Sequence, residues 1–85
     1  MQPRTAGLYI NRAYLRYRLD SYTGAMADYD YALRLEPLNV TALFNRGLLL
    51  AEVSANDLAL ADFNKVLELE PDDFRALYNR ALINR

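Results

Sequence analysis

Side chains able to perform acid–base or nucleophilic chemistry are few and poorly placed. The sequence has no cysteine and no histidine, which excludes zinc sites built from those ligands and any thiol or imidazole catalysis. A catalytic base would have to be a carboxylate, as in paired-acid hydrolysis, and the candidate pairs are Asp28 with Asp30 and Asp72 with Asp73. The first pair is spaced to point to different faces of a helix, and the second precedes a helix as a cap. We predict no enzyme, no metal site and no cofactor.

A second set of polar side chains recurs in one register. The triplets at 11–13, 45–47 and 79–81 read Asn-Arg-Ala, Asn-Arg-Gly and Asn-Arg-Ala, and they are spaced by 34 residues. An amide side chain both donates and accepts hydrogen bonds, so a row of asparagines is able to pair with the backbone of an extended peptide. The alternative is that each asparagine only bonds to the next helix, with the neighbouring aromatic residues forming core between repeats.

The arginine of each triplet has an acid that repeats in step with it. Arg12 and Arg46 lie near a predicted helix crossing, where a charge is costly unless it is paired. Asp28 and Asp62 recur at the same 34-residue spacing on the following helix. We therefore predict Arg–Asp pairs that tie neighbouring helices together; a ligand-binding role for these arginines is the alternative. Guanidinium groups directed into open solvent would contradict the pairing.

These residues belong to an internal repeat. Residues 6–39 align with 40–73 at ten identical positions without a gap, where chance gives about two. Each unit reads as two amphipathic helices separated by a turn-forming pair and ended by proline. The first helix has apolar positions from Leu8 to Leu19. The other predicted helices are 22–35, 40–53, 56–69 and 74–85.

Charge and hydropathy narrow the partners. The formal net charge is −1, distributed as +1 over residues 1–39, −5 over 40–73 and +3 over 74–85. No basic footprint for nucleic acid is present, and the longest apolar run, 47–51, is too short to span a membrane. Residues 1–5 show no signal-peptide pattern. The sequence gives no indication of a cellular compartment.

The period and the ladder of small and large residues resemble the tetratricopeptide repeat. Ala13, Gly47 and Ala81 fall at its first small position. The remaining matches are Ala25 and Ala59 (second small position), Tyr29 and Phe63 (aromatic slot), Ala32 and Val66 (third small position), and Pro37 and Pro71 (terminal proline). The family's leading tryptophan is replaced at positions 9, 43 and 77, and the leucine before the first small residue is arginine throughout. The resemblance implies an all-α superhelix (a solenoid) with repeats at 6–39 and 40–73 and the first helix of a third at 74–85. The recurring triplet marks an Asn-Arg-Gly/Ala subtype.

The same resemblance implies a scaffold for protein–protein interaction. In this family the first helix of each repeat lines a concave groove, and the matching positions make a candidate surface for a protein or peptide partner. Its members are Ile10, Asn11, Tyr14, Tyr17, Phe44, Asn45, Leu48, Arg75, Tyr78 and Asn79.

One narrower family function can be checked residue by residue. Relatives that bind the carboxyl-terminal tail of heat-shock proteins use a five-residue clamp of basic and amide side chains, which maps to Ile10, Tyr14, Asn45, Arg75 and Asn79. Apolar groups replace the first lysine and first asparagine and cannot hold a carboxylate. We therefore do not expect chaperone-tail capture.

Self-association is the competing hypothesis. The last predicted helix has no partner helix, and Phe74, Leu77, Leu82 and Ile83 do not give it a polar outer face, as the end of a solenoid requires. Apolar repeat ends favour a homo-oligomer.

Overall fold

The computed structural model describes residues 4–85, and this part of the chain forms five helices and no strand. Residues 1–3, part of the segment without a signal-peptide pattern, lie outside the described residues. The predicted third helix ends one residue early, and the fifth ends before the terminal arginine. The helices are α1 (Arg4–Arg18), α2 (Tyr22–Leu35), α3 (Val40–Glu52), α4 (Asn56–Leu69) and α5 (Phe74–Asn84).

The turns after α1 and α3 have the same backbone geometry. Asp20 and Ser54 adopt left-handed conformations, with φ of 63° and 65°. After α1, the amide of Ser21 donates to the carbonyl of Arg16 at 2.7 Å and that of Asp20 to Tyr17 at 3.0 Å, which is a Schellman motif. The turn after α3 repeats both bonds 34 residues later. The last carbonyls of each helix are thereby satisfied, and the chain reverses within three residues.

The turns after α2 and α4 are set by proline and a capping side chain. Each is a four-residue turn with proline second, at 36–39 and 70–73, closed by an amide-to-carbonyl bond of 3.1 Å and 3.0 Å respectively, as proline at that position favours. Asn39 ends the first turn and accepts a hydrogen bond from the Ala42 amide at 3.0 Å. Asp73 ends the second and accepts from the amides of Arg75 and Ala76 at 3.0 and 3.1 Å. These bonds cap the N-termini of α3 and α5.

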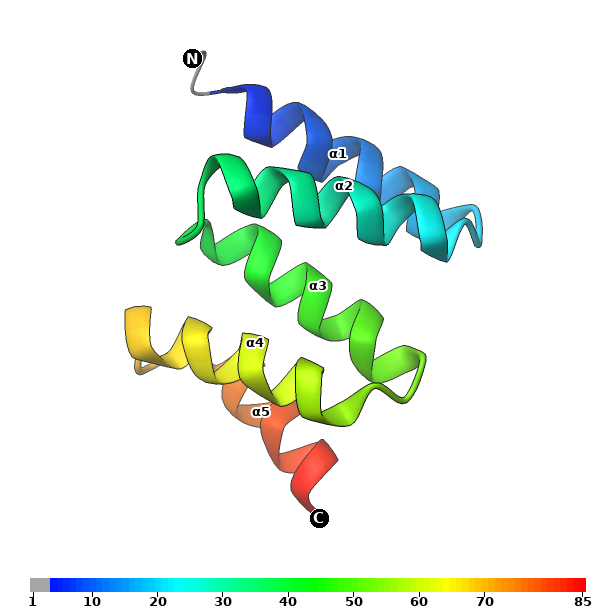
Figure 1. The fold of residues 1–85 in the computed structure, drawn as a ribbon. Coiled ribbons are helices and arrows are strands. Elements are labelled where there is room, and N and C mark those ends of the chain that lie inside the picture. The colour runs from blue at the N-terminus through cyan, green and yellow to red at the C-terminus, as the bar shows by residue number, and fades with distance from the viewer. Residues whose placement is uncertain (1–3) are drawn as a thin grey trace.

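The helices stack along one direction as two antiparallel pairs followed by a single helix. Figure 1 shows α1 with α2 at the N-terminal end, α3 crossing the middle, and α4 with α5 at the C-terminal end. The molecule is elongated, with extents of 38 × 27 × 17 Å. Each helix therefore contacts only its near neighbours along the stack, as in other repeat arrays.

Large aromatic side chains packed on small residues hold each pair together. Tyr29 of α2 and Phe63 of α4 are among the largest fully buried side chains. A Cβ atom on Gly47 would lie only 2.8 Å from Cε1 of Phe63, so the absence of a side chain there is what allows α3 and α4 to approach. Ala13 is the equivalent of Gly47 and is fully buried. The predicted ladder of small and large positions is therefore the core.

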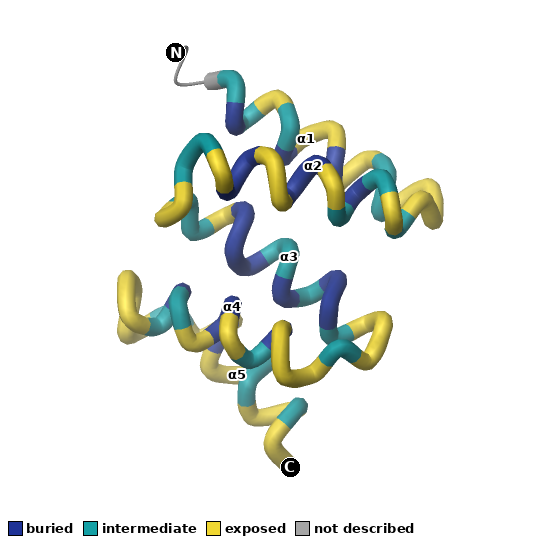
Figure 2. The backbone as a smooth tube through the Cα atoms, in the orientation of Figure 1, coloured by how far each residue is buried: buried dark blue, intermediate teal, exposed yellow. Residues whose placement is uncertain are grey.

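Burial is uneven along the stack. Figure 2 shows buried and intermediate positions along α3, and more exposed positions on the helices at the two ends. Leu8 and Leu19, which we assigned to the apolar face of the first helix, are 64% and 70% exposed. That assignment was wrong because no helix among residues 4–85 covers the outer side of α1. Periodicity identified the helix but not which of its faces is covered.

Candidate partner-binding surface

The candidate residues all lie on α1, α3 and α5, which approach one another along the stack. α1 contacts α3 and α3 contacts α5, whereas α2 and α4 do not contact each other. An array curves toward the side on which its helices are closer together. This spacing is what a curve with α1, α3 and α5 on its inner side requires.

Four of the candidate residues surround one small cavity between α1 and α3. Tyr14 and Tyr17 come from α1, Asn45 and Leu48 from α3, and Tyr29 of α2 completes the wall. The cavity has a volume of about 20 Å³, enough for one water molecule. Burial raises the pKa of Tyr29 to about 12. Sequence reasoning placed Tyr29 only in the core, because its aromatic slot gives no sign that one edge reaches this surface.

A tyrosine pair and one carboxylate fix the edge of this cavity. The hydroxyl of Tyr17 donates to Oε2 of Glu52 at 2.7 Å, and that of Tyr22 donates to Oε1 at 3.4 Å. The two rings stack with centroids 5.7 Å apart. The hydrogen bond to Glu52, reinforced by partial burial, raises the pKa of Tyr17 to about 12. Because these residues come from α1, α2 and α3, the contact joins three helices that no local pattern connects.

The three asparagines have different surroundings. Asn79 donates through Nδ2 to the carbonyl of Arg75, one turn back in its own helix, at 2.8 Å. Asn11 is exposed and Asn45 is partly buried, and within the described chain neither side chain has a hydrogen-bond partner. The bond from each asparagine to the next helix, which we weighed as the alternative, is thus not formed among residues 4–85. Two of the three amides are available to a partner.

The apolar candidates divide between core and surface. Ile10 and Phe44 are only 7% and 6% exposed, so they support the surface from beneath and offer little area to a partner. The guanidinium carbon of Arg75 lies 4.3 Å from the centre of the Phe44 ring, a cation–π contact. Tyr78 is 64% exposed. Arg75 and Tyr78 therefore form the accessible end of the row on α5.

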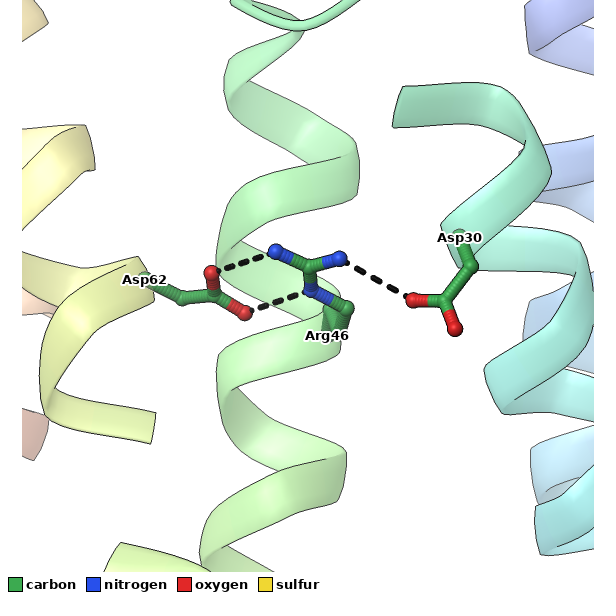
Figure 3. A network of polar contacts seen from close by, with 3 residues as sticks. All are labelled: Asp30, Arg46 and Asp62. Atoms are coloured by element: carbon green, nitrogen blue, oxygen red, sulfur yellow. Dashed lines mark hydrogen bonds and ion pairs between the residues drawn. The ribbon is translucent and has the colours of Figure 1, made fainter. Parts of the chain in front are cut away.

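The predicted Arg–Asp pairing is confirmed and extends to a third helix. Arg46 of α3 donates from Nε and Nη2 to the two carboxylate oxygens of Asp62 on α4, each at 2.8 Å. Its Nη1 donates to Asp30 on α2 at 3.0 Å (Figure 3). One guanidinium therefore joins both pairs of helices, and the bond to Asp62 raises the pKa of Arg46. Asp62 is 5% exposed, so the pair is part of the packed interior.

The first pair repeats this geometry near the N-terminal end. Arg12 donates from Nε and Nη2 to Asp28 at 2.9 and 2.8 Å, and Arg16 lies 3.3 Å from the same carboxylate. The hydrogen bond from Arg12 lowers the pKa of Asp28. Asp28 and Asp30 thus serve different arginines on different helices. The two carboxylates do not converge on a common point, as paired-acid catalysis would require.

The larger hollows lie on another part of the surface. Three open concavities of about 710, 350 and 430 Å³ adjoin one another over α2, α3 and α4. Asp30 lines all three, while Met26 and Arg46 each line two. Sequence reasoning did not anticipate this region, because its walls come from alternate repeats and no motif marks them.

Two further classes of site were examined over the described residues. No group of three or more His, Cys, Asp or Glu side chains among residues 4–85 is placed to hold a metal ion. None of the helices described is long and apolar enough to cross a membrane.

No protein-family model and no curated protein matches this sequence, but solved structures do. The chain is similar to the first TPR of Spaghetti (RPAP3) bound to the HSP90 peptide SRMEEVD, with 30% identity and a TM-score of 0.90, over 98% of this chain and 66% of that one. It is similar to a tetratricopeptide repeat protein from Parabacteroides merdae, with 32% identity and a TM-score of 0.92, over 96% and 32% of the respective chains. The first TPR domain of human RPAP3 gives 30% identity and a TM-score of 0.89, over 98% and 65%.

These likenesses confirm the predicted fold class. All three solved structures are tetratricopeptide-repeat proteins or domains, and the chain has their helical-repeat superhelix. It spans about two thirds of the two RPAP3 chains and about one third of the bacterial one.

Proposed function

We propose that this chain is a tetratricopeptide-repeat module that binds an extended segment of a partner protein along α1, α3 and α5. The observation that carries the proposal is the convergence of Tyr14, Tyr17, Asn45 and Leu48 on one small cavity between α1 and α3. A concave, partly apolar site with one convergent amide suits an anchor side chain flanked by peptide backbone. The similar domain bound to an HSP90 peptide supports the same mode of binding here.

The proposed site runs along one row of side chains. The asparagines supply hydrogen bonds to the peptide backbone, the tyrosines and Leu48 supply apolar contact, and Arg75 adds a positive charge at the end of the row. Ile10 and Phe44 hold this surface from the core. The full set is Ile10, Asn11, Tyr14, Tyr17, Phe44, Asn45, Leu48, Arg75, Tyr78 and Asn79. The repeats in this proposal run over 6–39, 40–73 and 74–85, and the Asn-Arg-Ala/Gly triplet defines their subtype.

The proposal does not extend to an HSP90 tail. At the five clamp positions, Ile10 is buried, Tyr14 is aromatic, and the Asn79 amide is engaged by its own helix. The Arg75 guanidinium lies over Phe44. A carboxylate placed there would meet few free donors, so we expect a partner segment recognised through its backbone and an anchor side chain. Nothing in this arrangement performs catalysis.

The test begins with a displayed library of linear peptides selected on the purified chain. Selected peptides are then measured against Asn45→Ala and Leu48→Glu, with Asn56→Ala at the exposed start of α4 as the matched control. Loss of hydrogen bonds to one amide costs about 1–3 kcal/mol, so we expect affinity to fall about tenfold or more in Asn45→Ala and to stay unchanged in the control. Equal binding to all three variants, or no binder from the library, would refute the site. The peptide SRMEEVD serves as a separate probe, and we expect no saturable binding.

Self-association is the alternative function, and the exposed apolar residues of α5 favour it. Phe74 and Leu77 are 69% and 41% exposed, and large apolar patches mark contact surfaces. Light scattering over a wide concentration range separates the two functions. A concentration-dependent oligomer that survives Asn45→Ala would support association through the ends of the stack in place of peptide binding along the row.

A further inference from the structure

The outer face of α5 repeats a face that is covered on α3. The two helices share a register of 34 positions, so Leu77 corresponds to Leu43 and Tyr78 to Phe44. Leu43 and Phe44 are 4% and 6% exposed, whereas Leu77 and Tyr78 are 41% and 64% exposed. α4 contributes to this difference: its Phe63 ring lies 5.8 Å from Phe44. Equivalent side chains on α5 have no such cover among residues 4–85.

Arg80 has the same incomplete surroundings. It corresponds to Arg46, which binds backward to Asp30 through Nη1 and forward to Asp62 through Nε and Nη2. Arg80 makes the backward bond alone: its Nη1 donates to Asn64 on α4 at 3.1 Å. Within the described chain, Nε and Nη2 of Arg80 have no carboxylate partner. The edge of the guanidinium that is bidentate in both earlier repeats is open on the uncovered face.

The two covered repeats define what would complete this face. α2 and α4 each present an alanine, an aspartate three positions later and an aromatic residue directly after it. In α4 these are Ala59, Asp62 and Phe63, which are 0%, 5% and 0% exposed. The carboxylate binds the arginine while the ring covers the small residue of the facing helix, Gly47. On α5 the corresponding small residue is Ala81, which is exposed.

We propose that the outer face of α5 binds an amphipathic helix from outside this chain, with the pattern Ala-x-x-Asp-aromatic and its carboxylate on Arg80. Charge supports an acidic occupant, since 74–85 carries three arginines and no acid. A bidentate Arg–carboxylate contact adds geometric selection to the attraction. A second copy fits less well, because its free end at α1 presents Arg12 and Arg16 and would bring like charges together. This surface is distinct from the row on α1 and α3.

The experiment uses an isotope-labelled chain and NMR, in which the Nε–H group of Arg80 reports directly on its partner. The probe is a synthetic peptide of residues 55–70 from the chain's own sequence, kept helical by a side-chain link between Asn64→Lys and Glu68, both exposed positions. The matched peptide carries Asp62→Asn. On the protein side, Arg80→Gln is compared with Arg85→Gln on the same helix, and Asn45→Ala reports on the separate groove.

We expect the first peptide to shift the Arg80 signal and the Asp62→Asn peptide to bind about tenfold more weakly, as loss of a charged hydrogen-bond pair implies. Arg80→Gln should weaken binding similarly, while Arg85→Gln and Asn45→Ala should leave it unchanged. Equal affinity of the two peptides, or no shift at millimolar peptide, would overturn the proposal. A shift of the Arg80 signal on raising the protein concentration alone would assign the face to a second copy and overturn it as well. Failure of the groove would show instead as unchanged library binding in Asn45→Ala, so the two outcomes are separable.

Discussion

Replacing Arg46 by leucine is the sharpest test of how the repeats are joined. The substitution leaves Asp62, which is 5% exposed, without its two hydrogen-bond donors, and it removes the link to Asp30. Breaking a buried ion pair from one side costs about 3–5 kcal/mol. The Arg46 side chain is 26% exposed, so water reaches part of the site and we expect a smaller loss of about 2–3 kcal/mol. In a domain of this size each kcal/mol lowers Tm by roughly 4–8 °C.

Two variants make this prediction specific. Arg12→Leu removes the equivalent arginine, but Asp28 keeps Arg16 at 3.3 Å, so we expect a clearly smaller fall in Tm. The double variant Arg46→Leu/Asp62→Leu leaves no unpaired buried charge, and it should recover about half of the lost stability because an apolar pair is often neutral relative to an ion pair.

The assay is thermal and urea unfolding followed by circular dichroism. Equal losses in Arg46→Leu and Arg12→Leu would refute the claim that burial and alternative partners set the cost. A double variant as unstable as Arg46→Leu would show that the loss comes from packing of the arginine stem and not from the stranded carboxylate.

Three further effects should be measurable in the same unfolding assay. Asp73→Ala removes a cap that accepts two amide hydrogen bonds, so we expect a loss of about 1 kcal/mol, with Asp73→Asn as the control that keeps most of it. Ser54→Gly relieves a left-handed backbone at φ 65° and should stabilise by up to about 1 kcal/mol; a loss would contradict the assigned turn. Tyr17 and Tyr29 have pKa values raised to about 12, so their contribution is complete below pH 10 and is lost as pH rises from 10 to 12. Tyr17→Phe should flatten that alkaline decline, and Glu52→Gln should reduce it.

Local patterns were sufficient to predict the helices and their turns. The 34-residue repeat and the proline-containing turns placed all five helices within about two residues of their ends. Asp73 was recognised as a cap because capping depends only on the next three residues. The Arg–Asp pairs were also predictable, since residues that repeat in step on adjacent helices meet wherever the helices meet.

The candidate site was only partly predictable. Spacing put Ile10 and Tyr14 on one face of the first helix, yet Ile10 is buried and Tyr14 is 49% exposed. Spacing also put the three asparagines in one register, but the Asn79 amide bonds to its own helix. A repeated register fixes a direction relative to the helix axis and does not fix what lies in that direction.

The sequence alone therefore determined the fold class, the repeat and the charge pairing, because each depends on contacts whose spacing recurs along the chain. The tertiary structure decided which faces are covered. It brought Tyr17, Tyr22 and Glu52 together from three helices, and it left the Arg80 guanidinium half satisfied on the outer face of α5. The physical reason is that burial depends on the neighbours that a helix acquires in the stack, and equivalent residues in successive repeats have different neighbours.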